Sequence, residues 1–179
     1  MEKGLVIVHT GDGKGKTTAA LGLAIRAWGD GLRVLILQFI KGGWKYGELA
    51  TLQKLAEIDG RIEIRQCGDG FTQRDASEEK QEEHRAMAAA ALQEAKTAIA
   101  SGDWDMVILD EINYAVKFNL IAIEDVLAIV KEKPDTLHLV LTGREARPAL
   151  VEVADLVTEM KLVKHPFQKG IKAQKGVEF

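Results

Sequence analysis

The feature that most constrains the fold is a regular alternation of short apolar runs with longer segments of helical pattern. Six runs rich in valine, isoleucine and leucine are predicted to be strands: Leu5–His9, Arg33–Phe39, Ile62–Gln66, Met106–Leu109, Leu137–Leu141 and Leu156–Glu159. Several are almost continuously apolar, which is typical of parallel strands because helices cover both faces of a parallel sheet. The alternation therefore predicts an α/β protein, with a mostly parallel sheet of about six strands and helices on both faces.

Helices are predicted between the strands from apolar periodicity and from residues that start or stop helices. The longest begins after a candidate N-cap, Ser77, and ends at Ser101 and Gly102. Glu78 and Glu79 fall in its first turn, where carboxylates interact favourably with the helix dipole. The other predicted helices span Thr17–Trp28, Glu48–Glu57, Ile123–Lys133 and Ala146–Ala154.

The length of 179 residues predicts a single domain, residues 1–179, because no linker or internal repeat divides the chain. Residues 160–179 depart from the strand and helix pattern and are rich in lysine. We expect them to form a docked, largely irregular C-terminal segment, and a mobile basic tail is the alternative. The apolar residues expected to anchor the segment are Leu162, Phe167, Ile171, Val177 and Phe179.

A glycine-rich turn follows the first predicted strand in "VIVHTGDGKGKTTAALGLA", residues 6–24. It is similar to the phosphate-binding P-loop, G-x-x-x-x-G-K-[ST], and it stands between a strand and a helix as that loop requires. There, backbone N–H groups and the helix N-terminus converge on phosphate oxygens. This context favours a P-loop NTPase, RecA-like architecture. The predicted nucleotide-binding residues of this loop are Gly11, Asp12, Gly13, Lys14, Gly15, Lys16, Thr17 and Thr18.

One position of the loop departs from the general pattern. Thr10 stands where the first glycine is expected, and Gly11 comes one residue late. The loop is thus either an ordinary nucleotide site with a tolerated substitution or a loop reshaped to hold its nucleotide differently. In both cases Lys16 would bring a positive charge to the phosphates, and the Thr17 hydroxyl would be a ligand of Mg²⁺.

Two acidic residues, Asp110 and Glu111, end the fourth predicted strand in "WDMVILDEIN". In P-loop proteins a carboxylate at this place lies beside the phosphates and holds magnesium directly or through water. Thr17, Asp110 and Glu111 are therefore the predicted metal ligands. In a hydrolase the second acid would activate water, and the sequence alone does not assign that role to Glu111. The structural alternative is that both acids cap the following turn.

Arg144 follows the fifth predicted strand in "LVLTGREARP". Ligands of open parallel sheets lie beyond the carboxyl ends of the strands, so Arg144 emerges at the same edge as the P-loop and Asp110. We predict that it contacts nucleotide or phosphate. An ordinary exposed surface arginine is the alternative.

The composition limits the partners. The formal charge of -3 argues against non-specific binding to nucleic acid, and no apolar run is long enough to predict a membrane span or a secretory signal. The single cysteine, Cys67, cannot form an internal disulfide and fits a reducing compartment. We therefore expect a cytoplasmic protein without a nucleic-acid or membrane partner.

Motifs along the chain carry a more specific resemblance. The loop "TGDGKGKTTAALG" is followed in order by "LQFIKGGWKYGE", "GDGFT", "LDEIN", "TGR" and the tail "ADLVTEMKLVKHPFQKGIKAQKGVEF". With these motifs the chain resembles the P-loop ATP:corrinoid adenosyltransferases, which act on cob(I)yrinic acid a,c-diamide and cob(I)alamin. The tail and the "QFIKG" segment are not shared by P-loop proteins in general.

The resemblance implies that the 5'-deoxyadenosyl group of ATP is transferred to the Co(I) centre of a reduced corrinoid. Co(I) attacks the 5' carbon and triphosphate leaves, so no general base is required. The implied catalytic residues are Lys16, Glu111 and Phe71, with Mg²⁺ stabilising the leaving charge. In this family the loop lacks the first glycine and ATP lies in the reverse direction. The resemblance also implies a homodimer and a flavodoxin-like electron donor.

The corrin side departs from the family pattern. The family carries "GFTW" after the third strand, whereas this chain has Phe71, Thr72 and Gln73 there, which leaves Phe71 as the main apolar wedge against the lower axial ligand. Trp44 and Tyr46 are predicted either to cover the corrin or nucleotide or to be exposed. Two other functions remain open: another kind of P-loop ATPase or kinase, and a non-catalytic protein that delivers adenosylcobalamin. A RecA-like DNA motor is a weaker third.

Overall fold

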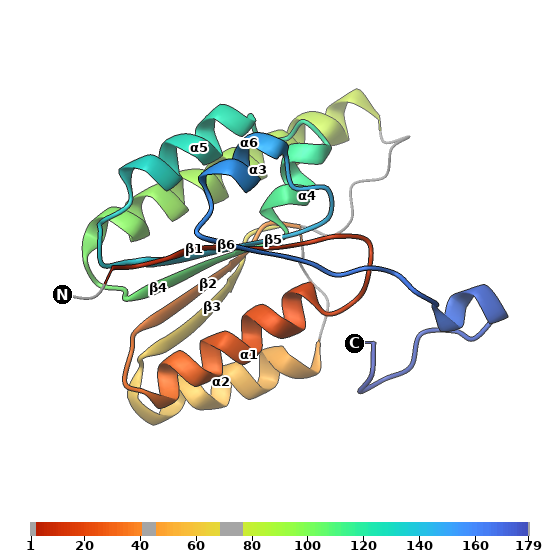
Figure 1. Ribbon diagram of the computed structural model, residues 1–179, viewed down its shortest axis with the longest axis horizontal. Coiled ribbons are helices and arrows are strands. Elements are labelled where there is room, and N and C mark those ends of the chain that lie inside the picture. The colour runs from red at the N-terminus through yellow and green to blue at the C-terminus, as the bar shows by residue number, and fades with distance from the viewer. Residues whose placement is uncertain (1–2, 41–45, 69–76, 179) are drawn as a thin grey trace.

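The computed structural model describes residues 3–40, 46–68 and 77–178. Within them the chain forms a six-stranded sheet with the order β3-β2-β4-β5-β1-β6, and every neighbouring pair is parallel (Figure 1). The strands are β1 Val6–Thr10, β2 Val34–Gln38, β3 Ile62–Gln66, β4 Met106–Asp110, β5 His138–Thr142 and β6 Leu156–Glu159. The predicted α/β class and the predicted number of strands are confirmed.

Helices cover both faces of the sheet. Figure 1 shows α1 and α2 on one face and α3, α4, α5 and α6 on the other. Their bounds are α1 Lys16–Gly29, α2 Gly47–Asp59, α3 Glu78–Ser101, α4 Ile112–Lys117, α5 Ile123–Glu132 and α6 Pro148–Val153. The short helix α4 was not predicted from the sequence. The sheet is therefore the middle layer of a three-layer domain.

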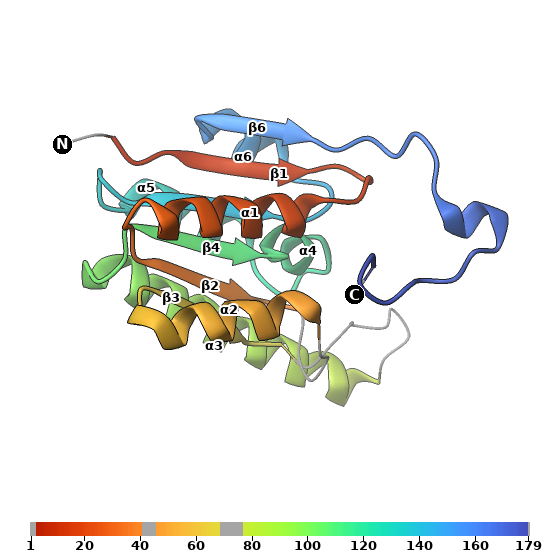
Figure 2. The ribbon, with the colours of Figure 1, turned by 90° about the horizontal axis from the view of Figure 1, so that it is seen from below.

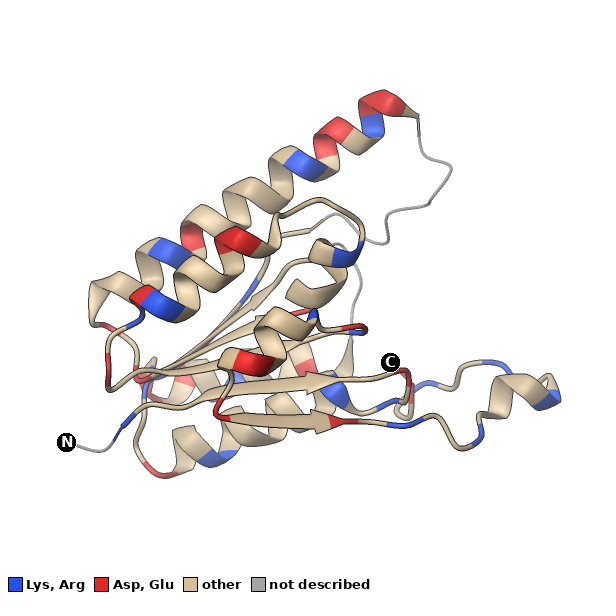
Figure 3. Cartoon of the chain, turned by 45° about the horizontal axis from the view of Figure 1, so that its top comes forward, with Lys and Arg blue, Asp and Glu red and all other residues tan. Residues whose placement is uncertain are grey.

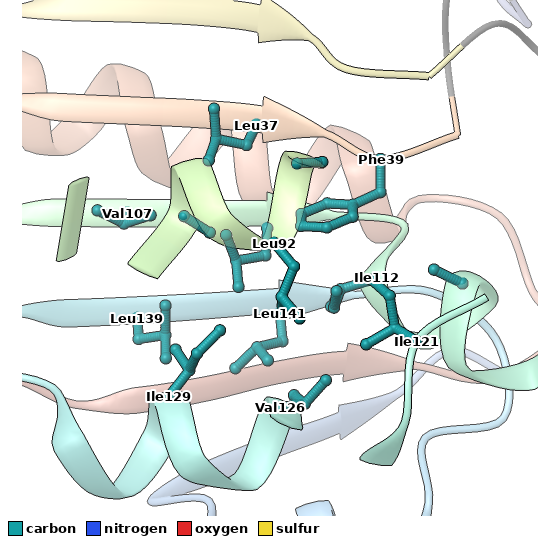
Figure 4. Packing of buried hydrophobic residues seen from close by; sticks show 14 of the residues in the cluster. Leu37, Phe39, Leu92, Val107, Ile112, Ile121, Val126, Ile129, Leu139 and Leu141 are labelled. Atoms are coloured by element: carbon teal, nitrogen blue, oxygen red, sulfur yellow. The ribbon is translucent and has the colours of Figure 1, made fainter. Parts of the chain in front are cut away.

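Two apolar clusters lie on the two faces of the sheet. On β2, Leu35 and Leu37 belong to the cluster under α3 to α6, whereas Val34 and Ile36 belong to the cluster under α1 and α2. Figure 4 shows Leu37 within the first of these clusters. Because successive side chains of a strand point to opposite faces, burial on both faces requires an almost unbroken apolar run. This is the pattern that the sequence shows.

The ends of α3 follow the predicted signals. The Ser77 hydroxyl accepts the backbone N–H of Lys80 at 3.4 Å, and the C-cap residue Gly102 has φ 75°. A positive φ of this kind favours glycine, which has no Cβ to clash with the following carbonyl. Figure 3 shows residues of both charges interspersed along this helix, as expected of a solvated face. No helix in the described ranges has the length and apolar content needed to cross a bilayer.

The C-terminal segment runs away from the domain and then turns back towards the start of α1 (Figures 1 and 2). It contains one short helical turn, η1 Pro166–Lys169. Two of the expected apolar anchors are largely exposed: Phe167 and Val177 are each 76% exposed. Polar contacts with the domain include an ion pair between Lys14 and Glu178. Leu162 and Ile171 are also exposed, and Phe179 lies outside the described residues.

Candidate active site

A cavity of about 520 Å³ lies at the carboxyl ends of the central strands. The P-loop forms one wall of it, and further side chains come from the start of α2, from the segments that follow β4 and β5, and from the C-terminal segment. The lining residues are Gly13, Lys14, Gly15, Lys16, Thr17, Thr18, Tyr46, Glu48, Glu111, Tyr114, Arg144, His165, Ala173 and Glu178. Its place agrees with the rule that ligands of open α/β sheets bind beyond the carboxyl ends of the strands.

The P-loop has a backbone that only glycine allows at two of its positions. Gly11 has φ 95°, and Gly15, the N-cap of α1, has φ 109°. The loop also lies against the chain that leaves β6, because the Gly13 N–H donates to the carbonyl of Met160 at 2.7 Å. A Cβ on Gly11 would come within 2.4 Å of that same carbonyl oxygen. The glycines thus permit both the turn and its close approach to Met160.

Lys16 is held over the loop. Its Nζ donates to the carbonyl oxygens of Gly11 at 2.7 Å and of Gly13 at 2.6 Å. Burial lowers the pKa of the Lys16 ammonium below its ordinary value, and the positive charge of Arg144 lowers it further, while Glu111 and another nearby carboxylate act in the opposite direction. The ammonium group is therefore placed in the cavity beside a second cation, as expected of a site for a highly charged anion.

Asp110 lies buried beneath the cavity and connects several elements of the site through hydrogen bonds. It is fully buried, and its Oδ1 accepts the hydroxyl groups of Thr17 at 2.8 Å and of Thr142 at 2.7 Å. Its Oδ2 accepts the side-chain amide of Gln38 at 3.0 Å. The Thr142 hydroxyl in turn accepts the backbone N–H of Glu111 at 2.9 Å. The ends of β2, β4 and β5 and the start of α1 are thereby joined through one carboxylate.

The oxygen donors around Thr17 fit a hard divalent cation. Because the Thr17 hydroxyl donates its proton to Asp110, its lone pairs remain available to the cavity that it lines. Glu111 lines the same cavity, whereas Asp110 stands behind Thr17 and could reach a cation through water. No group of three or more histidine, cysteine or acidic residues suited to a metal occurs in the described part of the chain. Mg²⁺ bound with phosphates and waters needs only one or two protein ligands, so this donor set suits it.

Glu111 begins the helix that the sequence did not predict. It has φ 67° and is the N-cap residue of α4. Such a conformation is uncommon for a residue other than glycine and turns the chain sharply from the strand into the helix. The turn places Glu111 and, one helical turn later, Tyr114 in the lining of the cavity.

Arg144 lies in the cavity lining on a tight turn after β5. Two residues of this turn have positive φ, Gly143 at 129° and Glu145 at 54°. A Cβ on Gly143 would come within 2.9 Å of the Cβ of Asn113, so the turn also packs closely on α4. The structure brings Arg144, Lys16 and Glu111 into one cavity.

The C-terminal segment closes one side of this cavity through His165, Ala173 and Glu178. The hydrogen bond with Lys14 holds the pKa of the Glu178 carboxyl below its usual range. His165 begins η1 with reciprocal capping contacts, because its ring accepts the Phe167 N–H and its own N–H donates to the side chain of Gln168. A segment that is mostly exposed nevertheless supplies side chains to the site.

Comparison with known proteins identifies the family. The model of the family "ATP:corrinoid adenosyltransferase BtuR/CobO/CobP" matches residues 2–179. The chain belongs to this family. A corrinoid adenosyltransferase of Pseudomonas aeruginosa is 44% identical over 180 residues, which is 99% of this chain and 85% of the relative. One from Sinorhizobium is 46% identical (99% and 81%), and one from Escherichia coli K12 is 40% identical (99% and 87%).

Solved structures show the same fold at low sequence identity. The flagellar accessory protein FlaH of Methanocaldococcus jannaschii has a TM-score of 0.56 and 12% identity, covering 89% of this adenosyltransferase and 72% of FlaH. The RadB recombinase has a TM-score of 0.52 and 15% identity, covering 90% and 77%. Likenesses at such identities concern the fold alone. The family assignment rests on the sequence matches.

Several residues of this adenosyltransferase site were not predicted from the sequence. Gln38 and Thr142 end β2 and β5, the two strands beside β4, and they lie next to Asp110 only because of the order of the strands in the sheet. Tyr114 reaches the cavity because it lies on α4, the helix that was not predicted. His165, Ala173 and Glu178 reach the cavity because the C-terminal segment turns back towards the P-loop. The predicted residues Phe71, Thr72, Gln73 and Trp44 lie outside the described residues.

Cys67 gives a simple chemical test of the end of β3. Burial, and secondarily the carboxylate of Glu94, raise the pKa of the Cys67 thiol to about 11. Near neutral pH the reactive thiolate is therefore scarce, and we expect alkylation of Cys67 by iodoacetamide to be much slower in the folded adenosyltransferase than in the chain unfolded by denaturant. Mass spectrometry over time measures both rates. Equal rates would contradict the environment described here.

Proposed function

We propose that this protein transfers the 5'-deoxyadenosyl group of ATP to the Co(I) centre of a reduced corrinoid and releases triphosphate, in the biosynthesis or salvage of adenosylcobalamin. The observation that carries the proposal is membership of the adenosyltransferase family over residues 2–179. The cavity supports it, because a P-loop, a lysine, an arginine and oxygen ligands for a cation meet there. These are the groups needed to bind a polyphosphate.

The side chains of the cavity then have distinct roles. Lys16, Arg144 and the N–H groups of residues 11–18 would bind the triphosphate oxygens and stabilise the charge that gathers as the leaving group departs. The Thr17 hydroxyl, oriented by its hydrogen bond to Asp110, would bind Mg²⁺ together with the Glu111 carboxylate. When bound, this ion supplies further positive charge to the triphosphate.

The chemistry requires no proton transfer by the protein. Co(I) provides both electrons of the new cobalt–carbon bond, and the bond between the 5' carbon and its phosphate oxygen breaks with its electron pair remaining on triphosphate. Glu111 therefore serves at the cation and not as a base. The chain must hold the 5' carbon towards the corrin and keep the triphosphate in the P-loop.

The decisive experiment is to incubate the protein with ATP, Mg²⁺ and a chemically reduced corrinoid under anaerobic conditions. We expect a light-sensitive adenosylcorrinoid and triphosphate in equal amounts, measured by absorbance and by phosphorus NMR. Formation of ADP and phosphate instead would support another kind of P-loop ATPase or kinase and overturn the proposal. Tight retention of adenosylcobalamin with negligible turnover would favour a delivery protein. Cobinamide and cobalamin are compared as substrates.

Two further parts of the proposal rest on family resemblance, a homodimer and a flavodoxin-like protein as the source of the electron that generates Co(I). A cytoplasmic location is proposed from the composition of the chain. Phe71 is proposed as the apolar wedge on the corrin side. The single cysteine of the chain agrees with a reducing compartment.

A further inference from the structure

Thr10, the residue that replaces the first P-loop glycine, makes a contact that glycine could not make. It ends β1 and is only 9% exposed. Its Oγ1 accepts the backbone N–H of Ala146 at 3.0 Å. Its backbone carbonyl separately accepts the N–H of Met160 at 2.9 Å. The side-chain contact is thus additional to the backbone bonds that β1 makes with its neighbours.

The partner of this hydroxyl belongs to the turn that carries Arg144. On one side of Arg144, the Gly143 N–H donates to the carbonyl of His9 at 3.2 Å. On the other side, the Ala146 N–H donates to Thr10. Two consecutive residues of β1 therefore hold both sides of Arg144. The P-loop begins directly after the second of them.

The turn needs such support because its backbone is unusual. Glu145, between Arg144 and Ala146, has φ 54°, a region that residues with a Cβ rarely adopt. Glu145 also forms an ion pair with Lys117 of α4, but that pair lies towards the surface and does not connect the turn to the P-loop. The Thr10 hydroxyl provides that connection through a side chain.

The position of Arg144 matters to the rest of the cavity. Arg144 and Lys16 line the same space, and the guanidinium is close enough to lower the pKa of the lysine. Two like charges held near each other favour binding of a multiply charged anion between them. A shift of the turn would move one of the two cations relative to the other.

We propose that Thr10 is a positioning residue whose hydroxyl fixes the Arg144 turn relative to the P-loop, so that Arg144 and Lys16 bind the same polyphosphate. The inference rests on the proposed function for the identity of that ligand, the triphosphate of ATP. According to this proposal, position 10 requires a side chain with a hydroxyl acceptor, whereas the general P-loop pattern has glycine there.

The test is a double-mutant cycle between Thr10 and Arg144. Thr10→Val keeps the shape of the side chain and removes the hydroxyl, Thr10→Ser keeps the hydroxyl, and Arg144→Ala removes the positioned group. Dissociation constants for ATP and for inorganic triphosphate are measured by calorimetry without corrinoid. We expect Thr10→Val to raise the dissociation constants of ATP and of triphosphate by about fivefold, which is the usual effect of losing one hydrogen bond. We expect Thr10→Ser to bind both ligands nearly as tightly as the wild type.

The cycle separates positioning from a general effect on stability. In the Arg144→Ala background, Thr10→Val is expected to produce no further loss of affinity, because the group that it positions is gone. An equal loss in both backgrounds, no loss in either, or failure of Thr10→Ser to restore affinity would each overturn the proposal. If Thr10→Val does not fold, as judged by circular dichroism, Thr10→Ala takes its place in the cycle.

A matched control and the choice of measurement keep the two proposals apart. Thr97→Val removes a hydroxyl that donates within α3 to the carbonyl of Gln93, away from the cavity, and should leave both dissociation constants unchanged. Because the binding assay contains no corrinoid, a wild-type protein that binds ATP but makes no adenosylcorrinoid would overturn the proposed function and leave the cycle decisive for Thr10.

Discussion

Replacing Lys16 with alanine is expected to lower kcat/KM for adenosyl transfer by at least about a hundredfold, the usual cost of removing one preorganised electrostatic contact from a transition state. The Nζ of Lys16 lies at the loop, bonded to the carbonyls of Gly11 and Gly13, where it can turn to the phosphates without a change of backbone. The charge on triphosphate grows as the carbon–oxygen bond breaks. We therefore expect kcat to fall as well as the affinity for ATP.

Steady-state kinetics with a chemically reduced corrinoid measure this effect, and isothermal calorimetry measures the affinity for triphosphate. Lys54→Ala on the exposed surface of α2 is the matched control, with the same loss of charge outside the cavity, and it should retain wild-type kinetics. A Lys16→Ala variant that keeps wild-type kcat/KM would show that the P-loop does not hold the leaving group. Unfolding curves establish that both variants are folded.

Replacing Asp110 with asparagine is expected to affect both stability and activity. The carboxylate accepts three side-chain hydrogen bonds, from Thr17, Thr142 and Gln38, and an amide cannot accept all three, because one of its two ends is a donor. A buried polar group left without its partner costs about 1 to 3 kcal/mol, and more where a charge is involved. We expect a loss of about 3 kcal/mol in the free energy of unfolding.

Activity should fall further than stability explains, because the neutral amide oxygen is a weaker acceptor for the Thr17 hydroxyl and brings no negative charge to the cation site. We expect the dependence of ATP binding on Mg²⁺ to weaken, which calorimetry at several Mg²⁺ concentrations measures. Asp135→Asn, in the exposed turn before β5, is the control with the same chemical change. Wild-type stability and Mg²⁺ dependence of Asp110→Asn would contradict the role given to this network.

The sequence was sufficient for the elements that depend on long apolar patterns. The predicted strand over Met106–Leu109 is observed as Met106–Asp110, and the signals at both ends of α3 were read correctly. Helix α4 was missed because six residues after an acidic pair are too few to show a helical period and resemble a turn. Local patterns are enough to predict a strand where burial on both faces of the sheet requires an apolar run.

The contacts between strands could not be derived in the same way. Gln38 lies opposite Asp110 because β2 pairs with β4 in that register, and Thr142 approaches from β5 on the other side. The order and register of parallel strands are set by packing between distant segments, which periodicity does not encode. Apolar composition was a poor guide in the C-terminal segment. It suggested burial, whereas Phe167 and Val177 are largely exposed.

The place of β1 in the sheet also has a consequence for the order in which the protein acquires its site. This strand is the first along the chain, yet its partners are β5 and β6, so that Val6 pairs with Leu139 and Thr10 with Glu159. During synthesis on the ribosome β1 therefore stays unpaired until β5 and β6 have been made. The P-loop, which follows β1 directly and bonds to Met160 beyond β6, therefore takes its working shape only after these later segments are in place.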